Sequence, residues 1–345
     1  MFQTHNIVKH ATIKDIANNL SLSVSTVSRA LTGDKNVREE TRNDILKTAK
    51  ELGYCPNPVA TNLKYGHSNT IGVIVPEMDT MYTIQVIRGI QSVLYEHSIK
   101  VIVADSNEDP ARERENLQMM EHFMVDGIII SLSSYLKNKD EYQRLQDQEM
   151  PMVFYGRIPH GLNVSQVLID DYAKSFFVVE RMILSGRHKI CHILGPKDVY
   201  NSSERARGYK DAMSKYGLAH GDDMQVYGGL DLDGGSIAAD RLIRRGVDFD
   251  GIFAFTDLLA IGAMQRLQEL GKKIPEDIYI SGFSGSMMST VVNPQLTTVE
   301  PPMFAMGETA ANLIMEKIKN PSSAARTVIL NAEIIMRGST GYYPK

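Results

Sequence analysis

Residues 12–31 read "TIKDIANNLSLSVSTVSRAL", and two short helical patterns follow each other there almost without a linker. Thr12 can cap the first helix, because Asp15 stands three residues later in the spacing of a capping box. The apolar residues of this stretch recur on one helical face: Ile13, Ile16, Ala17 and Leu20. The serine-rich break at 21–23 then separates this helix from the next one.

A second and a third helix follow in the same segment. Ser23 is a good N-terminal cap for the second helix, which we expect to end at Gly33. A third helix is expected over about 39–52, ending at Gly53. The inward residues of these two helices are Val27, Ala30, Leu31, Ile45, Ala49 and Leu52. Three small helices with a tight turn between the first two predict a helix-turn-helix domain over residues 11–56.

In such a domain the second helix lies in the major groove of DNA. Its outward residues are short and polar, apart from Val24 and Arg29, and the fork of Arg29 can reach guanine O6 and N7. Side chains of the first helix and of the loop after the second can hold phosphates. The expected contacts are Thr12, Lys14, Ser23, Val24, Ser25, Thr26, Ser28, Arg29 and Asn36. On this local pattern alone, a small helical bundle used for protein contacts is the alternative.

Residues 57–66, "NPVATNLKYG", predict a short hinge helix after the head. Asn57 is a capping residue, and proline is favoured at the first helical position that follows it. A helix of about seven residues is too short to be stable alone, so a partner must order it. Ala60 and Leu63 form a narrow apolar edge that suits insertion into the minor groove at a base step. We expect Asn57, Ala60, Leu63 and Lys64 to contact DNA; a linker helix that packs on the body is the alternative.

The composition of the 345 residues is that of an ordinary globular protein, with a net charge of −4. Residues 1–66 carry nine Lys/Arg against six Asp/Glu, whereas the remainder carries 28 against 35, so the head is the basic part. Cys55 and Cys191 stand in no metal-ligand spacing, so we expect a reducing compartment, no metal and no cofactor. The N-terminus lacks a secretory pattern and no apolar run could span a membrane, so a cytoplasmic location is expected.

From residue 67 onward, short apolar runs alternate with amphipathic stretches. The first block holds "TIGVIVP", "KVIVAD", "GIIISL" and "PMVFY", and the second holds "KICHILG", "MQVYGG", "GIFAFT" and "IYISGF". Apolar strands alternating with helices indicate parallel sheets covered on both faces, hence an α/β fold. Two such blocks predict two lobes, and a ligand would bind between them at the carboxyl ends of the strands.

The segments "TIKDIANNLSLSVSTVSRAL", "ELGYCPNPVATNL" and "TIGVIVP" together resemble the LacI/GalR family of bacterial transcription regulators. The resemblance runs from about residue 11 almost to the C-terminus. It implies a type I periplasmic-binding-protein-like body over 67–345, which binds the effector and dimerises. Lobe 1 would comprise about 67–168 and 299–322, and lobe 2 about 172–295 and 326–345. The chain would cross between the lobes near 168–172, 295–299 and 322–326.

The same resemblance implies function. The protein would be a homodimer that binds double-stranded operator DNA, most often as a repressor, and Leu63 of each subunit would enter the operator centre. A small-molecule effector, a sugar or sugar derivative, would occupy the cleft. A solute-binding protein without DNA function is the alternative, and we find no local signature of an enzyme.

The family pattern also places effector contacts. "SSERARGYKDAM" matches a segment whose arginine reaches the ligand, and "AFTDLLAIGAM" matches a segment that lies at the cleft. The implied contacts are Asp79, Tyr82, Tyr155, Arg157, Asn201, Arg205, Leu230, Thr256, Asp257 and Ser284. For Asp257 the alternative is a helix cap only, and for Arg205 a surface ion pair.

Three departures from the family pattern bear on the ligand. "TMY" at 80–82 replaces a frequent "NPF", Ser284 replaces an acidic residue, and Gly156 stands where an aspartate is frequent. Two carboxylates that accept hydrogen bonds from sugar hydroxyls are thereby lost. With Arg157 and Arg205 beside fewer carboxylates, we expect a more positive cleft and an acidic sugar or sugar phosphate as effector.

Overall fold

The computed structural model describes residues 11–55 and 67–342. The chain divides after Ser68 into two compact units, here called the head and the body. The expected hinge contacts Asn57, Ala60, Leu63 and Lys64 lie outside the described residues.

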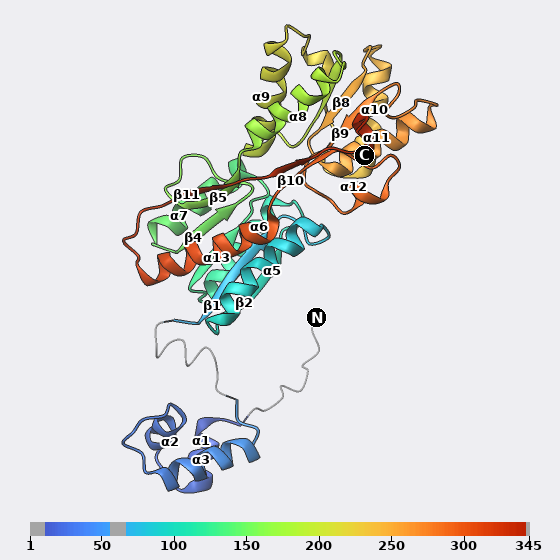
Figure 1. Cartoon of the computed structure of the whole chain (residues 1–345). Helices are drawn as coiled ribbons and strands as arrows, with labels where there is room; N and C mark the ends of the chain where they lie inside the picture. The colour runs from blue at the N-terminus through green and yellow to red at the C-terminus, as the bar shows by residue number, and fades with distance from the viewer. Residues whose placement is uncertain (1–10, 56–66, 343–345) are drawn as a thin grey trace, which may run out of the picture. The chain divides into compact units, whose positions relative to one another are not determined.

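The head contains three helices, labelled in Figure 1: α1 (Ile13–Leu20), α2 (Val24–Leu31) and α3 (Glu39–Glu51). The expected capping box is confirmed, since the Thr12 backbone N–H donates to Asp15 Oδ2 at 2.7 Å and the Asp15 N–H donates to Thr12 Oγ1 at 3.4 Å. Ser23 Oγ accepts from the Thr26 N–H at 3.1 Å and so caps α2 as expected.

The inward faces of these helices form one small core. It consists of Ile16, Ala17, Val27, Ala30, Ile45 and Ala49 of the helices, together with Val37 of the loop before α3. The expected inward position of Leu52 is wrong: α3 ends one residue earlier, and Leu52, as the C-cap, is 37% exposed. Tyr54 packs against the core from beyond the helix end instead.

The first lobe of the body is built on a six-stranded, wholly parallel sheet in the order β11-β5-β4-β3-β1-β2. Its strands are β1 (Thr70–Val75), β2 (Lys100–Asp105), β3 (Gly127–Ile130), β4 (Met152–Tyr155), β5 (Ser165–Ile169) and β11 (Thr327–Leu330). Its helices are α5 (Met81–Glu96), α6 (Pro110–His122), α7 (Tyr135–Asp147) and α13 (Met303–Lys319). Residues of α5 and α13 pack on one face of the sheet, and residues of α6 and α7 on the other.

The second lobe is built on a four-stranded parallel sheet in the order β7-β6-β8-β9. Its strands are β6 (Ile190–Leu194), β7 (Gln225–Tyr227), β8 (Gly251–Ala254) and β9 (Tyr279–Ser281). Its helices are α8 (Asp171–Leu184), α9 (Tyr200–Lys215), α10 (Leu232–Arg244), α11 (Asp257–Glu269) and α12 (Met288–Val291), with 3-10 turns η1 (Asp222–Met224) and η2 (Gly338–Thr340). Both blocks of alternating strands and helices expected from the sequence are confirmed.

The chain passes between the two sheets three times (Figure 1). The first passage follows β5. The second includes β10 (Thr298–Glu300), which pairs antiparallel with β12 (Glu333–Ile335) of the third passage. The third passage differs from the expected 322–326, because β11 first pairs with β5 as an edge strand of lobe 1, so that the chain leaves that lobe only after Leu330. Residues 327–330 therefore belong to lobe 1.

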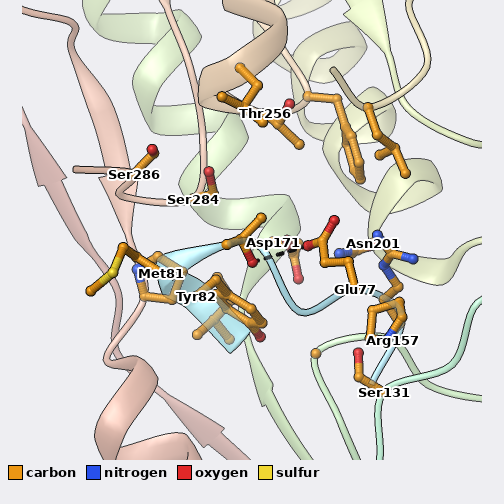
Figure 2. A pocket seen from close by; sticks show the side chains of 18 of the residues that line it. Glu77, Met81, Tyr82, Ser131, Arg157, Asp171, Asn201, Thr256, Ser284 and Ser286 are labelled. Carbon is orange, nitrogen blue, oxygen red and sulfur yellow. Dashed lines mark hydrogen bonds between the residues drawn. The ribbon is translucent and has the colours of Figure 1, made fainter. Parts of the chain in front are cut away.

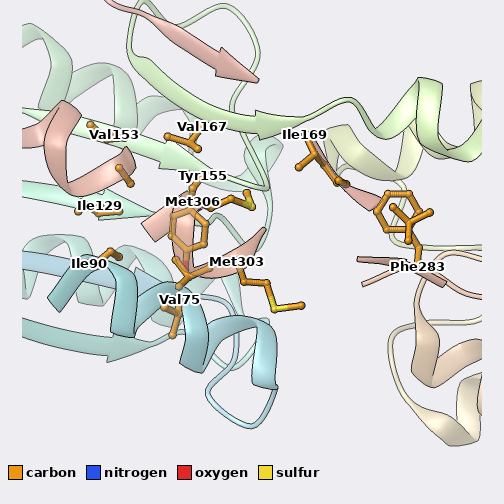
Figure 3. Packing of buried hydrophobic residues seen from close by; sticks show 14 of the residues in the cluster. Val75, Ile90, Ile129, Val153, Tyr155, Val167, Ile169, Phe283, Met303 and Met306 are labelled. Carbon is orange, nitrogen blue, oxygen red and sulfur yellow. The ribbon is translucent and has the colours of Figure 1, made fainter. Parts of the chain in front are cut away.

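Apolar side chains of both lobes meet in one large cluster. Figure 3 shows Tyr155 among residues of the first sheet and of α5 and α13, with Phe283 of the second lobe farther along the same cluster. Helices α5 and α13 approach each other closely because each has a glycine at the contact. A Cβ added at Gly89 would lie 2.0 Å from the Phe304 carbonyl oxygen, and one at Gly307 would lie 2.1 Å from the Val86 carbonyl oxygen.

Replacing Gly307 by alanine should therefore destabilise the body, although alanine is the better helix former. The added methyl group must push α13 away from α5, and overpacking of this kind costs about 1–3 kcal/mol. Urea denaturation of the full chain measures the free energy of unfolding. Asn312→Ala, on the exposed side of the same helix, is the control and should change this free energy by less than about 0.5 kcal/mol. Equal stability of Gly307→Ala and wild type would contradict the close packing.

Candidate functional site

The exposed side of α2 is a polar surface with one basic residue. Ser23, Val24, Ser25 and Arg29 are exposed, whereas Thr26 and Ser28 are half-buried. The Arg29 Nε–H donates to the Ser25 carbonyl oxygen at 3.4 Å, so the guanidinium folds back along its own helix. This bond is long, and the side chain can exchange it for a guanine edge at small cost.

The other expected DNA contacts of the head precede or follow this helix in the sequence. Thr12 and Lys14 are exposed at the start of α1. Asn36 is exposed in the loop before α3, where its backbone N–H and its Nδ2 both donate to Asp34 Oδ1, at 2.9 and 3.0 Å. The nearby Arg42 side chain donates to the Asp34 carbonyl oxygen at 2.6 Å and holds the same loop. The loop that presents Asn36 is thus braced from within the head.

The body contains a cavity of about 290 Å³ at the carboxyl ends of strands from both sheets. Its walls include Glu77 after β1, Ser131 after β3, Arg157 after β4, Thr256 after β8 and Ser284 after β9. Helices α5, α8 and α9 contribute further residues from their first turns. Of the ten expected effector contacts, eight line this cavity: Asp79, Tyr82, Arg157, Asn201, Arg205, Leu230, Thr256 and Ser284.

A buried ion pair between Asp171 and Arg205 forms one wall of the cavity, and Figure 2 labels Asp171 among the lining residues. Arg205 Nε donates to Asp171 Oδ1 at 2.7 Å, and Arg205 Nη1 donates to the Phe255 carbonyl oxygen at 2.6 Å. The guanidinium carbon lies 3.5 Å from the centre of the Phe283 ring. Burial raises the pKa of Asp171, and the guanidinium of Arg205 opposes this rise. Arg205 is therefore no surface ion pair but a buried group fixed by a carboxylate, a carbonyl and an aromatic face.

The cleft is not positive, contrary to expectation. Arg157 forms a bidentate pair with Glu108, at 2.7 and 2.8 Å, and Arg205 is paired with Asp171. The cavity lining itself holds three carboxylates, of Glu77, Asp79 and Asp171, against these two guanidinium groups. Burial raises the pKa of Glu77, while Arg157 holds it down. Each of the two arginines is thus paired with a carboxylate from another part of the chain. The absence of acidic residues at 156 and 284 therefore does not make the cleft positive.

One polar atom on the cavity wall has no partner among the described residues. Asn201, on α9 one turn before Arg205, is 8% exposed, and its Oδ1 accepts no hydrogen bond there. Since buried acceptors are normally satisfied, this oxygen is suited to receive a hydrogen bond from a bound molecule. Thr256 is already engaged, because its Oγ1 accepts from the Leu259 N–H at 3.3 Å and caps α11.

Two expected contacts do not line the cavity. Tyr155 is fully buried beneath it, and its hydroxyl has no hydrogen-bond partner in the described parts of the chain. Asp257 lies in the first turn of α11, where it accepts from the Ser286 N–H at 2.6 Å and from Thr298 Oγ1 at 2.5 Å. Burial raises the pKa of Asp257 to about 6. Asp257 thus positions the 284–288 loop, which does line the cavity, and ties it to the second passage between the lobes.

Sequence reasoning missed several lining residues. Asp171 is the most important of them, since it pairs with Arg205 from the helix that follows the first passage between the lobes. Its place after the strand "SQVLID" was a usable signal, because carboxyl ends of strands carry ligands. The apolar lining had no such signal and was also missed: Met81, Phe255, Leu258, Met287, Met288 and Met306.

Two contacts hold the lobes together away from these residues. Ser134, before α7 of lobe 1, donates a short hydrogen bond to the carboxylate of Asp198 of lobe 2. The rings of His160 and Tyr200 meet edge to face with centroids 5.3 Å apart. The lobes therefore touch through protein groups as well as around the cavity.

Comparison with known proteins places these features in a family. Residues 12–57 match the model of bacterial regulatory proteins of the lacI family, and residues 179–340 match a periplasmic binding protein-like domain. Catabolite control protein A of Priestia megaterium is 31% identical over 332 residues, which cover 96% of this chain and 99% of that protein. This chain belongs to the lacI family. The resemblance seen in the sequence is thereby confirmed.

Solved structures agree with this assignment. The complex of the transcriptional regulator CelR with cellobiose superposes with a TM-score of 0.73 at 26% identity, covering 95% of this chain and 99% of that one. The lac repressor dimer bound to operator and the anti-inducer ONPF has a TM-score of 0.82 and covers 96% and 99%. At 20% identity, the second likeness shows the fold alone.

As a member of the lacI family, the chain is a DNA-binding transcription regulator under small-molecule control, and not an enzyme. Within 11–55 and 67–342, no group of three or more His, Cys, Asp and Glu side chains could hold a metal ion. No helix in the same ranges is long and apolar enough to cross a lipid bilayer.

Proposed function

We propose that this lacI-family protein is a cytoplasmic, homodimeric repressor whose operator affinity is controlled by a neutral, polyhydroxylated ligand of about the size of a mono- or disaccharide. The observation that carries the proposal is the Asp171–Arg205 pair beside the unpaired Asn201 oxygen. A carboxylate accepts from sugar hydroxyls, a guanidinium donates to them, and a neutral amide can do both. The cavity of about 290 Å³ is just below the roughly 300–1,000 Å³ usual for small-molecule sites, so a small ligand suits it.

A neutral ligand suits this cavity better than the acidic sugar that the sequence favoured. An anion would meet three carboxylates in the lining, and both arginines already have carboxylate partners. To bind a ligand carboxylate, Arg205 would have to share its charge with Asp171 in a water-poor environment, where unbalanced charge is costly. CelR, a similar protein, forms a complex with the neutral sugar cellobiose.

Operator recognition is proposed for α2 and for residues 57–66. Arg29 and the start of α2 would contact base edges, while Thr12, Lys14 and Asn36 would hold the backbone. For residues 57–66 the proposal rests on the sequence alone, with Leu63 of each subunit entering one base step at the operator centre. Two symmetric half-sites are expected, since a dimer of such heads reads a palindrome.

Ligand binding would act on DNA binding through the relative position of the two lobes. The cavity takes residues from both lobes, so a ligand in it favours one arrangement over the other. Any lobe movement that alters how the two heads of a dimer are held changes operator affinity by the same coupling free energy by which DNA changes ligand affinity. Either sign of this coupling is compatible with the described contacts.

Isothermal titration calorimetry of the full chain tests the ligand class. We expect saturable binding of at least one neutral sugar among cellobiose, D-glucose and D-ribose, and no binding of glucuronate or glucose 6-phosphate at the same concentrations. Fluorescence anisotropy with DNA from the protein's own upstream region, with and without the bound sugar, then reports the coupling. Binding of only the acidic compounds would refute the neutral ligand.

A further inference from the structure

Position 156, at the end of β4, cannot carry a side chain in this structure. Gly156 has a φ of +64°, a region that L-residues other than glycine rarely adopt. In addition, a Cβ placed there would lie 2.6 Å from the hydroxyl oxygen of Tyr82. The closest approach is to that hydroxyl, and the next atom of the ring lies 3.6 Å away. Loss of the Tyr82 hydroxyl alone would thus remove the steric conflict, although not the cost of the backbone conformation.

Tyr82 is held where it is. It lies in the first turn of α5, its ring packs against the large apolar cluster, and its hydroxyl donates to Met306 Sδ at 3.8 Å. A thioether sulfur is a weak acceptor, so this bond leaves the hydroxyl available to a stronger acceptor. Burial raises the pKa of Tyr82, so the hydroxyl stays protonated and uncharged at neutral pH. Figure 2 shows Tyr82 pointing into the cavity.

A second neutral hydroxyl lies at the same place. Ser131 Oγ is 3.9 Å from the point that a Cβ of residue 156 would occupy, and Ser131, Gly156 and Tyr82 all line the cavity. Any side chain at 156 would therefore start close to both hydroxyl groups, at the wall of the cavity. Arg157, the next residue in the chain, is paired with Glu108, and after burial the carboxylates of Asp171 and Glu77 also raise the pKa of Tyr82.

We propose that Tyr82 determines ligand specificity at this end of the cavity, because its hydroxyl fills the space of a side chain at 156 and leaves the hydroxyl groups of Tyr82 and Ser131 as the polar groups nearest to that position. The inference rests on the proposed function, since it describes the same cavity. It adds that the ligand group between Tyr82 and Ser131 is a hydrogen-bond acceptor or an uncharged hydroxyl, such as a ring oxygen or a sugar hydroxyl. The side chain that Tyr82 excludes from 156 could be a carboxylate, which would accept a hydrogen bond from an ammonium group, so an aspartate at 156 should raise the affinity for an amino sugar above that of wild type.

The steric part is tested without any ligand by a double-mutant cycle in the full chain. Thermal unfolding is measured for wild type, Tyr82→Phe, Gly156→Ala and the combination of both. The backbone cost at 156 is common to both backgrounds and cancels, so the cycle isolates the contact with the hydroxyl. We expect Gly156→Ala to lower Tm by about 3 °C or more beyond its effect in the Tyr82→Phe background. Equal Tm losses in the two backgrounds overturn the proposal.

The specificity part is tested by calorimetry with D-glucose and glucosamine, which differ in one hydroxyl. The ratio of the two affinities in wild type is the reference value. The combination of Tyr82→Phe and Gly156→Asp places a carboxylate between these positions and should shift this ratio toward glucosamine by at least tenfold. Tyr82→Phe alone should weaken glucose binding several-fold without this shift. A combined variant with the same ratio of glucosamine affinity to glucose affinity as wild type overturns the proposal.

The two failures are distinguishable. If wild type binds neither compound nor cellobiose or D-ribose, the proposed ligand class fails, and the unfolding cycle still decides whether Tyr82 excludes a side chain at 156. If a neutral sugar binds but the cycle shows no coupling, the ligand class stands and the role of Tyr82 fails.

Discussion

Arg205→Ala is expected to abolish ligand binding and to destabilise the body by about 3–5 kcal/mol. The substitution removes the guanidinium that lines the cavity, and it leaves Asp171, whose side chain is 3% exposed, without its ion-pair partner. It also leaves the Phe255 carbonyl oxygen without the 2.6 Å hydrogen bond from Arg205. Calorimetry with the sugar that binds wild type measures the first effect, and urea denaturation the second.

The loss of stability should depend on pH. Without Arg205, burial and the nearby carboxylates of Glu204 and Asp170 all raise the pKa of Asp171, so it stays above the unfolded value in the folded protein. The folded variant then holds a proton that the unfolded chain releases, so its deficit grows as pH rises through the folded pKa and shrinks as pH falls. Denaturation at pH 5 and pH 8 compares the two regimes.

Arg207→Ala is the matched control on the same helix. Its ion pair with Glu204 is on the surface, with 53% of the Arg207 side chain exposed, so the loss should stay below about 1 kcal/mol. Ligand affinity should remain at the wild-type value, because Arg207 is not among the residues that line the cavity. Similar losses for both variants would show that the Asp171–Arg205 pair has no special role.

Arg29→Ala should relax the base preference at one position of each operator half-site by about 1–3 kcal/mol. The guanidinium is the only fork-shaped donor on the exposed side of α2 as described, and a bidentate contact to guanine is lost entirely on truncation. Anisotropy titrations against a set of operators, each with one base pair changed, measure the preference. The capping bonds of α2 involve Ser23 and Thr26, so the head should keep its fold.

Lys14→Ala provides the comparison for Arg29. Lys14 is exposed at the start of α1 and is expected to contact phosphate, so its removal should weaken all the operators alike and reduce the salt dependence of binding by about one unit of slope. If Arg29→Ala keeps every base preference of wild type, Arg29 does not contact a base. A base-specific loss for Lys14→Ala would show that the two roles were assigned wrongly.

The sequence was most informative where structure is decided locally. Thr12 with Asp15, and Ser23 before α2, predicted helix starts because a capping bond joins residues only three positions apart. Apolar runs predicted eight strands of the two sheets, since buried parallel strands require such runs. The prediction that Leu52 faces inward was wrong, because a helical pattern does not show at which residue the helix ends.

What the sequence could not predict depends on residues far apart in the chain. Arg205 and Asp171 are 34 positions apart, and Arg157 and Glu108 are 49 apart, so neither pairing follows from periodicity. The expectation of a positive cleft was therefore wrong. It rested on the carboxylates that are missing at 156 and 284, whereas other positions of the chain supply carboxylates to the same cleft. The contact by which Tyr82 excludes a side chain at 156 also joins residues that are far apart in the chain, so the sequence alone could not predict it.

The late edge strand β11 has a consequence for how the protein is made. Lobe 1 receives its last strand from Thr327–Leu330, so its sheet stays incomplete until nearly the whole chain has left the ribosome. The head, by contrast, has its own core within residues 16–49 and can fold as soon as that short stretch emerges. A newly synthesised molecule would then have a folded DNA-binding head well before its body could bind a ligand.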